Sequence, residues 1–282
     1  MSKVLLTGAR GFLGKALLMQ LQSAGMQVFG IDMEQGDITL ESTLKPYDHE
    51  KIGHVIHLAG KTFVPESWDH PFSYYQVNVM GTVNVLEFCR RNKAGLIYIS
   101  SYLYGEPESL PVSEDHPVKA YNPYSHTKVL AENACHFYSR AYGLKIVILR
   151  PFNAYGPGQP SRFIIPEIIA KVKDRDVDLV EVMDLRPRRD FIYIDDLTNA
   201  IRLSVNAPHG IYNLGSGYSV SVEEIIKEVM EITGIRKKYR GRGSERPNEI
   251  FDLYADITRA KRELNWEPLI RFEQGLAQCI NG

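Results

Sequence analysis

The sequence predicts an α/β protein built on a doubly wound parallel sheet, with a smaller α/β region in its second half. Short apolar runs typical of buried parallel strands recur along the first half, and helical patterns separate them. A glycine-rich turn follows the first apolar run. The 282 residues, 44% of them hydrophobic, are enough for one such domain and a smaller appendage.

Five apolar runs in the first half are predicted strands, and the patterns between them predict three helices. The strands are Val4–Thr7, Gln27–Ile31, His54–Leu58, Leu96–Ser100 and Lys145–Arg150. The helices are Phe12–Ala24, Phe72–Asn92 and Tyr124–Tyr142. Because strand and helix alternate, right-handed crossovers would place helices on both faces of one parallel sheet. Residues 1–150 are therefore predicted to form the first domain.

After Arg150 the regular alternation stops. Residues 151–282 are predicted to be mainly a substrate-binding region, with some segments returning to the first sheet. Helical patterns occur at Ile164–Asp174, Asp195–Asn206, Ser221–Thr233 and Asp256–Leu264. Strand-like runs occur at Leu179–Val182, Asp190–Tyr193 and Ile211–Leu214. Arg236–Arg246 is strongly basic, and its ordinary interpretation is a solvated loop.

The composition argues against several classes of function. With 33 basic and 34 acidic residues, the chain has no general attraction for nucleic acid or membrane surfaces. Cys89, Cys135 and Cys279 are too few and too widely spaced for a disulfide framework or a metal site, so we expect reduced thiols and no metal. No apolar run approaches the length of a membrane span. Met1 leads straight into the first strand with no signal peptide, so we expect a cytoplasmic protein.

The first predicted strand ends in Thr7–Gly14, a GxxGxxG run that opens the first helix. Glycines there allow a tight turn and a close approach of the backbone to a pyrophosphate, which then faces helix N–H groups. A flexible surface turn is the alternative, but the position at the first strand–helix junction favours a Rossmann dinucleotide site. The predicted cofactor residues of the turn are Gly8, Arg10, Gly11, Phe12, Leu13 and Gly14.

Asp32 closes the second predicted strand, eighteen residues after Gly14. A carboxylate at this place accepts hydrogen bonds from the adenosine ribose hydroxyls and repels a 2′-phosphate. Residues 33–35 supply no arginine for that phosphate, so NAD is predicted rather than NADP. The alternative for Asp32 is a solvated turn residue. Asp37 and Ile38 follow and are weaker candidates for contacts with the adenine.

Tyr124 and Lys128 are four residues apart, which places both side chains on one face of a helix. The spacing alone proves little, because Tyr47 and Lys51 repeat it in a polar stretch. The context of Tyr124 is different, since it follows a strand that ends in Ser100-Ser101 and begins a long helix. A nearby ammonium and a cationic nicotinamide both favour phenolate, so the tyrosine can exchange a proton with a substrate hydroxyl during hydride transfer. A packing helix with a surface lysine is the alternative.

With these residues in place, the sequence resembles the extended short-chain dehydrogenases/reductases, the NAD-dependent epimerase/dehydratase family typified by UDP-galactose 4-epimerase. The similarity covers nearly the whole chain. The matching motifs are Thr7–Gly14, His57-Leu58-Ala59-Gly60, Asn78-Val79-Met80-Gly81-Thr82, Ser100-Ser101 with Tyr104-Gly105, Asn122-Pro123-Tyr124 with Lys128, Arg150-Pro151-Phe152-Asn153 with Tyr155-Gly156-Pro157-Gly158, and Arg189–Asp196.

The resemblance implies a nucleotide-diphosphate-sugar substrate, with Asn153, Arg189 and Arg246 near its diphosphate. Arginine suits this role because its planar fork pairs with phosphate oxygens. The alternative for Arg189 is an ion pair with Asp190 or another carboxylate. The resemblance also implies further cofactor contacts from Leu58, Ala59, Gly60, Asn78, Tyr124, Lys128 and Pro151.

Departures from the family pattern narrow the range of reactions that the sequence predicts. Family members usually have one more residue between the second serine and Tyr-Gly. Counting forward from the strand makes Ser101 the catalytic serine, whereas counting back from Gly105 makes it Ser100. We favour Ser101. Dehydratases of the family follow this serine or threonine with an acidic residue. Here Tyr102 and Leu103 follow, which disfavours 4,6-dehydration.

The leading hypothesis is therefore an NAD-dependent nucleotide-sugar epimerase in which Tyr124 is the acid/base. The rival is an NAD(P)H-dependent reductase of a nucleotide 4-keto-6-deoxy sugar, and a non-catalytic nucleotide-sensing scaffold is the alternative outside enzymes. The resemblance implies a homodimer in which the helices Phe72–Asn92 and Tyr124–Tyr142 form a four-helix bundle. Apolar residues suited to that face, or equally to the core, are Val129, Leu130, Ala134 and Phe137.

Overall fold

A computed structural model describes residues 3–243 and 249–282 of the chain. The strands are β1 (Lys3–Thr7), β2 (Gln27–Ile31), β3 (His54–His57), β4 (Gly95–Ile99), β5 (Ile146–Pro151), β6 (Asn153–Tyr155), β7 (Leu179–Val182), β8 (Arg188–Arg189), β9 (Phe191–Tyr193), β10 (Gly210–Leu214), β11 (Val220–Ser221) and β12 (Lys238–Gly241). The helices are α1 (Phe12–Ser23), α2 (Val64–Asp69), α3 (Pro71–Tyr74), α4 (Gly81–Asn92), α5 (Pro123–Tyr142), α6 (Ile164–Lys173), α7 (Ile194–Ser204), α8 (Val222–Thr233), α9 (Thr258–Leu264) and α10 (Phe272–Asn281).

Six parallel strands form the central sheet in the order β10-β5-β4-β3-β1-β2, which confirms the predicted doubly wound fold. The chain moves from β1 to β2 on one side and then crosses to β3 on the other side of β1. Ligands of such sheets bind beyond the strand ends at this reversal. The ends of β1 and β3, which carry the predicted cofactor motifs, therefore lie side by side. The last strand, β10, comes from the second half of the chain.

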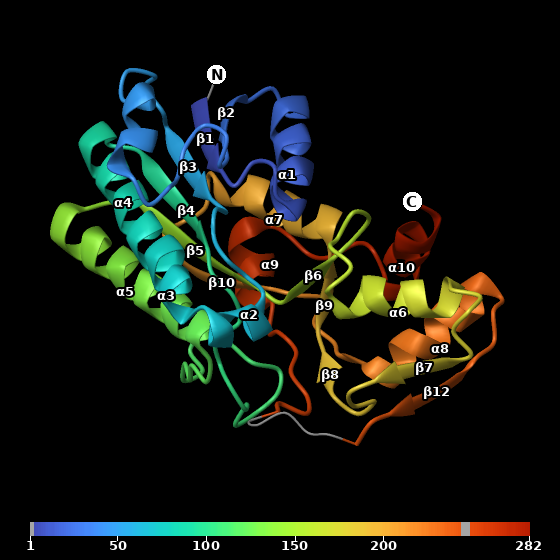
Figure 1. Cartoon of the computed structure of the whole chain (residues 1–282). Coiled ribbons are helices and arrows are strands. Elements are labelled where there is room, and N and C mark those ends of the chain that lie inside the picture. The colour runs from blue at the N-terminus through green and yellow to red at the C-terminus, as the bar shows by residue number, and fades with distance from the viewer. Residues whose placement is uncertain (1–2, 244–248) are drawn as a thin grey trace.

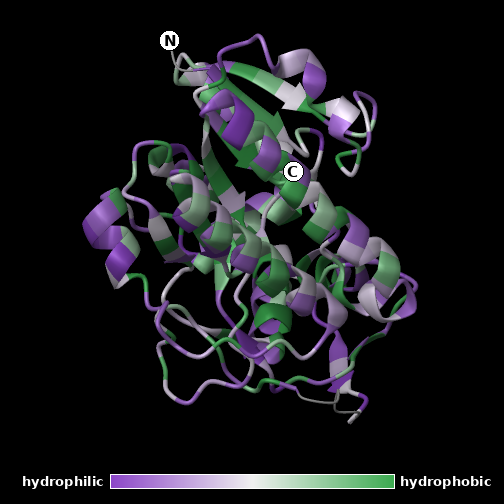
Figure 2. Cartoon of the chain, turned by 90° about the vertical axis from the view of Figure 1, so that its left-hand side faces the viewer, coloured by the Kyte–Doolittle hydropathy of each residue, from purple (hydrophilic) through white to green (hydrophobic). Residues whose placement is uncertain are grey.

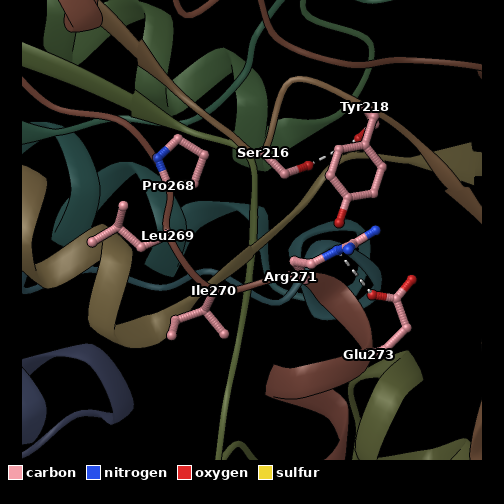
Figure 3. Close-up of a pocket in the computed structure, with 7 residues that line it drawn as sticks. All are labelled: Ser216, Tyr218, Pro268, Leu269, Ile270, Arg271 and Glu273. Carbon is pink, nitrogen blue, oxygen red and sulfur yellow. Dashed lines mark hydrogen bonds and ion pairs between the residues drawn. The ribbon is translucent and has the colours of Figure 1, made fainter.

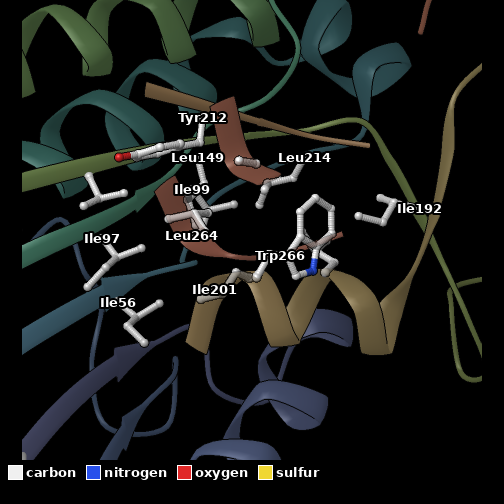
Figure 4. Close-up of a cluster of buried hydrophobic side chains, with 14 of the residues drawn as sticks. Ile56, Ile97, Ile99, Leu149, Ile192, Ile201, Tyr212, Leu214, Leu264 and Trp266 are labelled. Atoms are coloured by element: carbon white, nitrogen blue, oxygen red, sulfur yellow. The ribbon is translucent and has the colours of Figure 1, made fainter. Parts of the chain in front are cut away.

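Helices cover both faces of the sheet (Figure 1). The helices α4 and α5 pack on one face, and α1 and α7 pack together on the other. Trp266 fills the core under α7, where Leu149, Ile192 and Ile201 also lie (Figure 4). Its indole N–H donates to the carbonyl of Asp196 at 3.0 Å, so the segment after α9 is fixed to the first turn of α7.

The C-terminal lobe surrounds a core of its own. The helices α6, α8 and α10 lie beside the parallel pair β7–β12, to the right of the central sheet in Figure 1. Residues such as Ile168, Val180 and Val229 are fully buried there. Two sequence interpretations are wrong in detail. Part of the basic stretch, Lys238–Gly241, is a strand rather than a loop, and Phe72–Asn92 contains a π-helical segment at Tyr75–Met80 rather than one uniform helix.

Hydrophobic residues concentrate on the strands of the central sheet, and hydrophilic residues predominate on the outer turns of the helices and on the loops (Figure 2). This is the pattern of a sheet buried on both faces. Within the residues that the structure describes, no helix combines the length and apolar character needed to span a membrane.

Candidate active site

The turn between β1 and α1 is shaped for a ligand that approaches its backbone closely. Gly8 has φ of +71°, and a Cβ atom there would lie 2.8 Å from the amide nitrogen of Ala59. A Cβ on Gly14 would lie 2.0 Å from the carbonyl oxygen of Gly8, so only glycine fits. Gly11 caps α1 without a side-chain hydrogen bond, and no acidic residue lies in the first turn. The N–H groups of that turn are thus available to an anion such as a pyrophosphate.

Asp32 lies immediately after β2, beside this turn. Its Oδ2 accepts a 2.9 Å hydrogen bond from the backbone N–H of Arg10, and its Oδ1 accepts one of 2.8 Å from Met33. Each carboxylate oxygen keeps a second lone pair for a ribose hydroxyl. The sequence did not indicate that Arg10 itself reaches this edge, where its guanidinium forms an ion pair with Glu34.

Asp37 and Ile38 lie in the loop that follows. Asp37 accepts a 2.9 Å bond from the N–H of Thr39, and the carbonyl of Ile38 accepts a 3.0 Å bond from Asn84 on α4. The Ile38 side chain is buried against Gly81, where an added Cβ would lie 2.9 Å from it. Ile38 therefore belongs to the packing that fixes α4 under the loop.

A buried series of hydrogen bonds connects β1, β3 and α4. Thr82 donates to the carbonyl of Asn78 at 2.6 Å, so its oxygen accepts from Nε2 of His57 at 3.1 Å. Nδ1 of His57 is then the acceptor for Thr7 at 2.7 Å, and Thr7 accepts from the N–H of Ala59 at 3.2 Å. Burial, with the nearby positive charge of Lys128, lowers the pKa of His57 to about 3, so the ring is neutral. These hydrogen bonds fix the strand ends beneath the glycine turn.

Asn78 holds the segment after β3 against α5. Its Oδ1 accepts from the N–H of Lys61 at 2.8 Å, and its Nδ2 donates to the carbonyl of Lys61 and to Thr127, both at 3.0 Å. A Cβ on Gly60 would lie 3.0 Å from Asn78 Oδ1 and 3.8 Å from Lys128 Nζ. Gly60, Asn78 and Lys128, predicted from separate motifs, therefore meet at one place. Leu58 and Ala59 precede them at the end of β3.

The structure separates the two candidate serines. The hydroxyl of Ser101 lies close enough to the phenol of Tyr124 to affect its pKa, whereas the hydroxyl of Ser100 is buried and has no hydrogen-bond partner among the described residues. Burial raises the pKa of Tyr124 to about 12, and the nearby Ser101 hydroxyl acts in the opposite direction. Asn122 caps α5 through a reciprocal pair of bonds with Ser125, and this cap places Tyr124 in the first turn of the helix.

Lys128 lies one helical turn after Tyr124 and is buried. Its Nζ donates a 2.8 Å hydrogen bond to the carbonyl of Ile99, the last residue of β4. Nζ also lies 5.0 Å above the ring of Tyr98. Burial lowers the pKa of Lys128 to about 8, while the carboxylate of Glu132 acts to raise it. At neutral pH the side chain is therefore mostly an ammonium.

Asn153 lies two residues after Pro151, which ends β5. Its Oδ1 accepts a 3.1 Å hydrogen bond from the phenol of Tyr102, and its Nδ2 donates to the carbonyl of Asp190 at 2.9 Å. The ring of Tyr102 stacks on Phe152, with ring centres 5.1 Å apart. From the sequence, Tyr102 was only a departure from the dehydratase pattern; its contact with Asn153 needed the fold.

Arg189 forms an ion pair at 2.5 Å with Glu249, and its guanidinium also donates to the carbonyl of Ile250 at 2.5 Å. The partner is thus another carboxylate and not Asp190. The carboxylate of Asp190 is fully buried and accepts hydrogen bonds from the N–H groups of residues 216, 217 and 255. Arg246, the third predicted substrate residue, lies outside the described residues.

A cavity of about 330 Å³ lies among the C-terminal loops, where Ser216 and Tyr218 face Arg271 and Glu273 (Figure 3). None of the predicted site residues lines it. A second cavity, of about 560 Å³, is bordered by Arg175 and residues 236–238 of the basic stretch. In the described parts of the chain, no three His, Cys, Asp or Glu side chains gather in a way that could hold a metal ion.

Known proteins share both the sequence and the fold. Residues 4–215 match the model of the NAD-dependent epimerase/dehydratase family. A UDP-glucuronate 4-epimerase from Thermodesulfobacterium geofontis is 32% identical, in an alignment that covers 100% of this chain and 96% of that protein. A GDP-6-deoxy-D-mannose reductase from Pseudomonas aeruginosa is 30% identical, covering 99% and 96%. The crystal structure of a Thermus thermophilus UDP-glucose 4-epimerase in complex with NAD superposes with a TM-score of 0.90 at 25% identity, over 99% of this chain and 98% of that one. The protein is therefore an NAD-dependent enzyme that belongs to the NAD-dependent epimerase/dehydratase family.

Proposed function

We propose that this enzyme is a nucleotide-sugar epimerase with Tyr124 as its acid/base. The observation that carries the proposal is the contact of the Tyr124 phenol with the Ser101 hydroxyl, one helical turn from the Lys128 ammonium. These groups lie beside the strand ends that carry the glycine turn. Phenol, hydroxyl and ammonium together form a proton-transfer site for a sugar hydroxyl.

Tyr124 accepts the proton of a sugar hydroxyl, and Ser101 hydrogen-bonds to the same sugar oxygen. Bound NAD would supply the hydride acceptor, and later the hydride donor, for the carbon bearing that oxygen. The keto sugar turns over within the site so that the hydride returns to its other face, and Tyr124 gives the proton back. No net oxidation results. In the structure, burial raises the pKa of Tyr124 to about 12. Lys128 is proposed to supply the ammonium that favours the phenolate during the reaction.

The cofactor is proposed to lie along residues 1–150. The turn Gly8–Gly14 would hold the pyrophosphate and Asp32 the adenosine ribose, with Asp37 and Ile38 on the adenine side. The unoccupied lone pairs of Asp32 and the uncapped first turn of α1 support this assignment. The remaining proposed contacts come from Leu58, Ala59, Gly60, Asn78, Tyr124, Lys128 and Pro151.

The nucleotide diphosphate of the substrate is proposed to bind Asn153 and Arg189, on residues 151–282. Asn153 Nδ2 keeps one hydrogen beyond the one given to Asp190. Arg189 is paired with Glu249, so a diphosphate must share or displace that carboxylate. Arg246 remains a proposed third contact. The related epimerases named for UDP-sugars support a substrate of this class.

Reduction of a nucleotide 4-keto-6-deoxy sugar is the second candidate. The related GDP-6-deoxy-D-mannose reductase favours it, because that protein spans nearly the whole chain at the same level of identity as the epimerases. The same Tyr124 and Lys128 would serve, with NADH or NADPH as a consumed reductant. Asp32 favours NAD and thereby the epimerase.

We further propose a cytoplasmic homodimer of carbohydrate metabolism in which α4 and α5 of two copies form a four-helix bundle. Phe72, Met80 and Phe137 are 73%, 53% and 54% exposed on these helices and their approach. Val129, Leu130 and Ala134 are partly buried. Light scattering at low concentration tests the dimer, and Phe137→Glu should dissociate it. A monomeric wild-type protein would contradict it.

A panel of nucleotide sugars tests the function. Purified protein is incubated with each sugar with and without NADH, and the products are resolved by NMR. An epimerase interconverts two isomers without consuming NADH, whereas a reductase consumes one NADH per product. Turnover that survives Tyr124→Phe would contradict both.

A further inference from the structure

A buried ion pair lies next to the site but outside the residues that the proposed function uses. Arg150 in β5 and Glu132 in α5 are 3% and 4% exposed. The guanidinium donates from Nε to Oε1 at 3.0 Å and from its NH2 group to Oε2 at 2.6 Å. This is the bidentate geometry of a strong pair. It joins the middle of α5 to the strand that leads into Pro151.

Arg150 is itself fixed by a second set of contacts. Its NH1 group donates to the phenol of Tyr104 at 3.0 Å and to the carbonyl of Glu114 at 3.3 Å. Tyr104 in turn donates to Asn213 in β10 at 2.5 Å. The pair is therefore held by the loop residues Tyr104 and Glu114 and, through Tyr104, by β10, so the carboxylate of Glu132 has little freedom to move.

Glu132 lies one turn after Lys128, so both side chains project from the same face of α5. The two groups that act to raise the pKa of Lys128 are Glu132 and Cys135. Burial raises the pKa of the Cys135 thiol well above its usual value, so it is neutral. Of these two neighbours, only Glu132 therefore carries a negative charge that favours the ammonium form of Lys128.

The groups that face Lys128 from the sheet are neutral as well. Burial raises the pKa of Tyr98 on β4 well above 10. His57 on β3 is uncharged, since burial lowers its pKa to about 3. Replacing a buried ion pair by apolar side chains is often neutral or stabilising, so fold stability alone is a weak reason for two buried charges here.

We propose that Glu132, fixed by Arg150, is a positioning residue that keeps Lys128 an ammonium beside Tyr124. The proposal rests on the proposed role of Tyr124 and Lys128. The proposal assigns a role to Arg150 and Tyr104, which belong to sequence motifs but take no direct part in the proposed reaction. Without the carboxylate, Lys128 would lose its proton at lower pH, by about one pH unit for the loss of one nearby charge.

Glu132→Gln keeps the shape of the side chain and removes its charge. In enzyme labelled with [13C]lysine, the Cε resonance of Lys128, assigned by its loss in Lys128→Met, reports the protonation state directly. We expect its midpoint to fall by about one pH unit in Glu132→Gln. The alkaline limb of the kcat/KM profile should move down with it, while KM for the nucleotide sugar at pH 6.5 changes little. Glu87→Gln on α4, outside this pair, is the matched control.

Glu132→Gln leaves Arg150 as an unpaired buried cation, which destabilises the fold whatever the state of Lys128. The double variant Glu132→Gln with Arg150→Met removes both charges. We expect it to fold, with a midpoint of Lys128 that lies below the wild-type value but falls less than in Glu132→Gln, because loss of the Arg150 cation acts in the opposite direction. In the wild-type enzyme labelled at glutamate carboxyl carbons, Glu132 should also report the titration of Lys128 at the same midpoint.

An unchanged Lys128 midpoint in the folded variants, or no response of the Glu132 carboxyl in the wild type, overturns the proposal. The resonance measurements need no turnover. A wild-type protein that is inactive on every nucleotide sugar would therefore reject the proposed function, while the coupling between Glu132 and Lys128 would still be measured.

Discussion

The phenol of Tyr102 hydrogen-bonds to the side-chain oxygen of Asn153 and fixes the orientation of that amide. The bond is 3.1 Å long, and the amide nitrogen donates to the carbonyl of Asp190 at 2.9 Å. Oxygen and nitrogen of the amide are thereby assigned without ambiguity. Because Tyr102 directly follows Ser101, this contact links the proposed proton-transfer site to the proposed diphosphate site.

Tyr102→Phe should weaken substrate binding rather than the chemical step. One hydrogen bond is lost, worth about 1 kcal/mol, so KM for the nucleotide sugar should rise about fivefold. We expect kcat to change less than twofold because Ser101 and Tyr124 are untouched. Steady-state kinetics measures both, with Tyr142→Phe on the exposed side of α5 as the control. A large fall in kcat at constant KM would instead give Tyr102 a part in the chemistry.

Tyr124→Phe should lower kcat by about 10²–10⁴-fold, the usual contribution of a positioned acid or base. NAD binding and the melting temperature should stay close to wild type, because the ring remains in place. Tyr47→Phe is the matched control, since Tyr47 repeats the spacing to a lysine four residues on. Its ring packs edge-on against Phe29 at 6.0 Å, far from any proposed chemistry. Equal loss in both variants would reject the assignment of Tyr124.

The first half of the chain was predictable because its signals are local. Buried parallel strands are continuous apolar runs, so all five predicted strands of that half are found within one or two residues of their observed ends. The reversal of strand order was not readable in the same way. The segment between β2 and β3 holds only two short 3-10 turns, at Glu41–Thr43 and Lys45–Tyr47. Only the pairing of β1 with both β2 and β3 shows where the sheet reverses.

The contacts that the sequence did not reveal join residues far apart in the chain. Lys238 pairs with Leu179 in a short strand whose composition is that of a basic loop. Arg189 is paired with Glu249, and Arg150 with Glu132, although no spacing rule connects either pair. The choice between two adjacent serines depended on side-chain direction at a strand end. The periodicity of a sequence predicts helices and strands, but it does not predict which distant side chains come into contact.

Asp32→Ser should reduce preference for NAD. The carboxylate offers hydrogen bonds to the ribose, and charged hydrogen bonds are worth about 1.5–3 kcal/mol, so affinity for NAD should fall about 10- to 100-fold. Affinity for NADP should improve relative to NAD, because the repulsion of a 2′-phosphate is gone and the Arg10 guanidinium lies at the same edge. Calorimetric titration with both cofactors tests this. Asp176→Asn, at an exposed position of the C-terminal lobe, is the control. A parallel loss for both cofactors would contradict the role of Asp32.

Lys128→Met should abolish turnover and stabilise the fold in a pH-dependent way. Burial lowers the pKa of Lys128 from 10.5 to about 8. Between these values the unfolded chain holds a proton that the folded protein has lost, so this group makes wild-type stability rise with pH in that window. Below about pH 8 the full cost of the buried ammonium is present, and above 10.5 it is gone.

The free energy of unfolding of Lys128→Met should therefore exceed that of the wild type by about 1–3 kcal/mol at pH 7. The gain is smaller than the pKa change alone would give, because methionine loses the 2.8 Å bond to the carbonyl of Ile99. It should shrink toward pH 10, because the folded wild-type lysine is then neutral and no longer carries the cost of a buried charge. Urea unfolding at pH 7 and pH 10 measures the difference, with the exposed Lys45→Met as control. An equal gain at both pH values would mean that packing, and not the buried charge, sets the stability of this position.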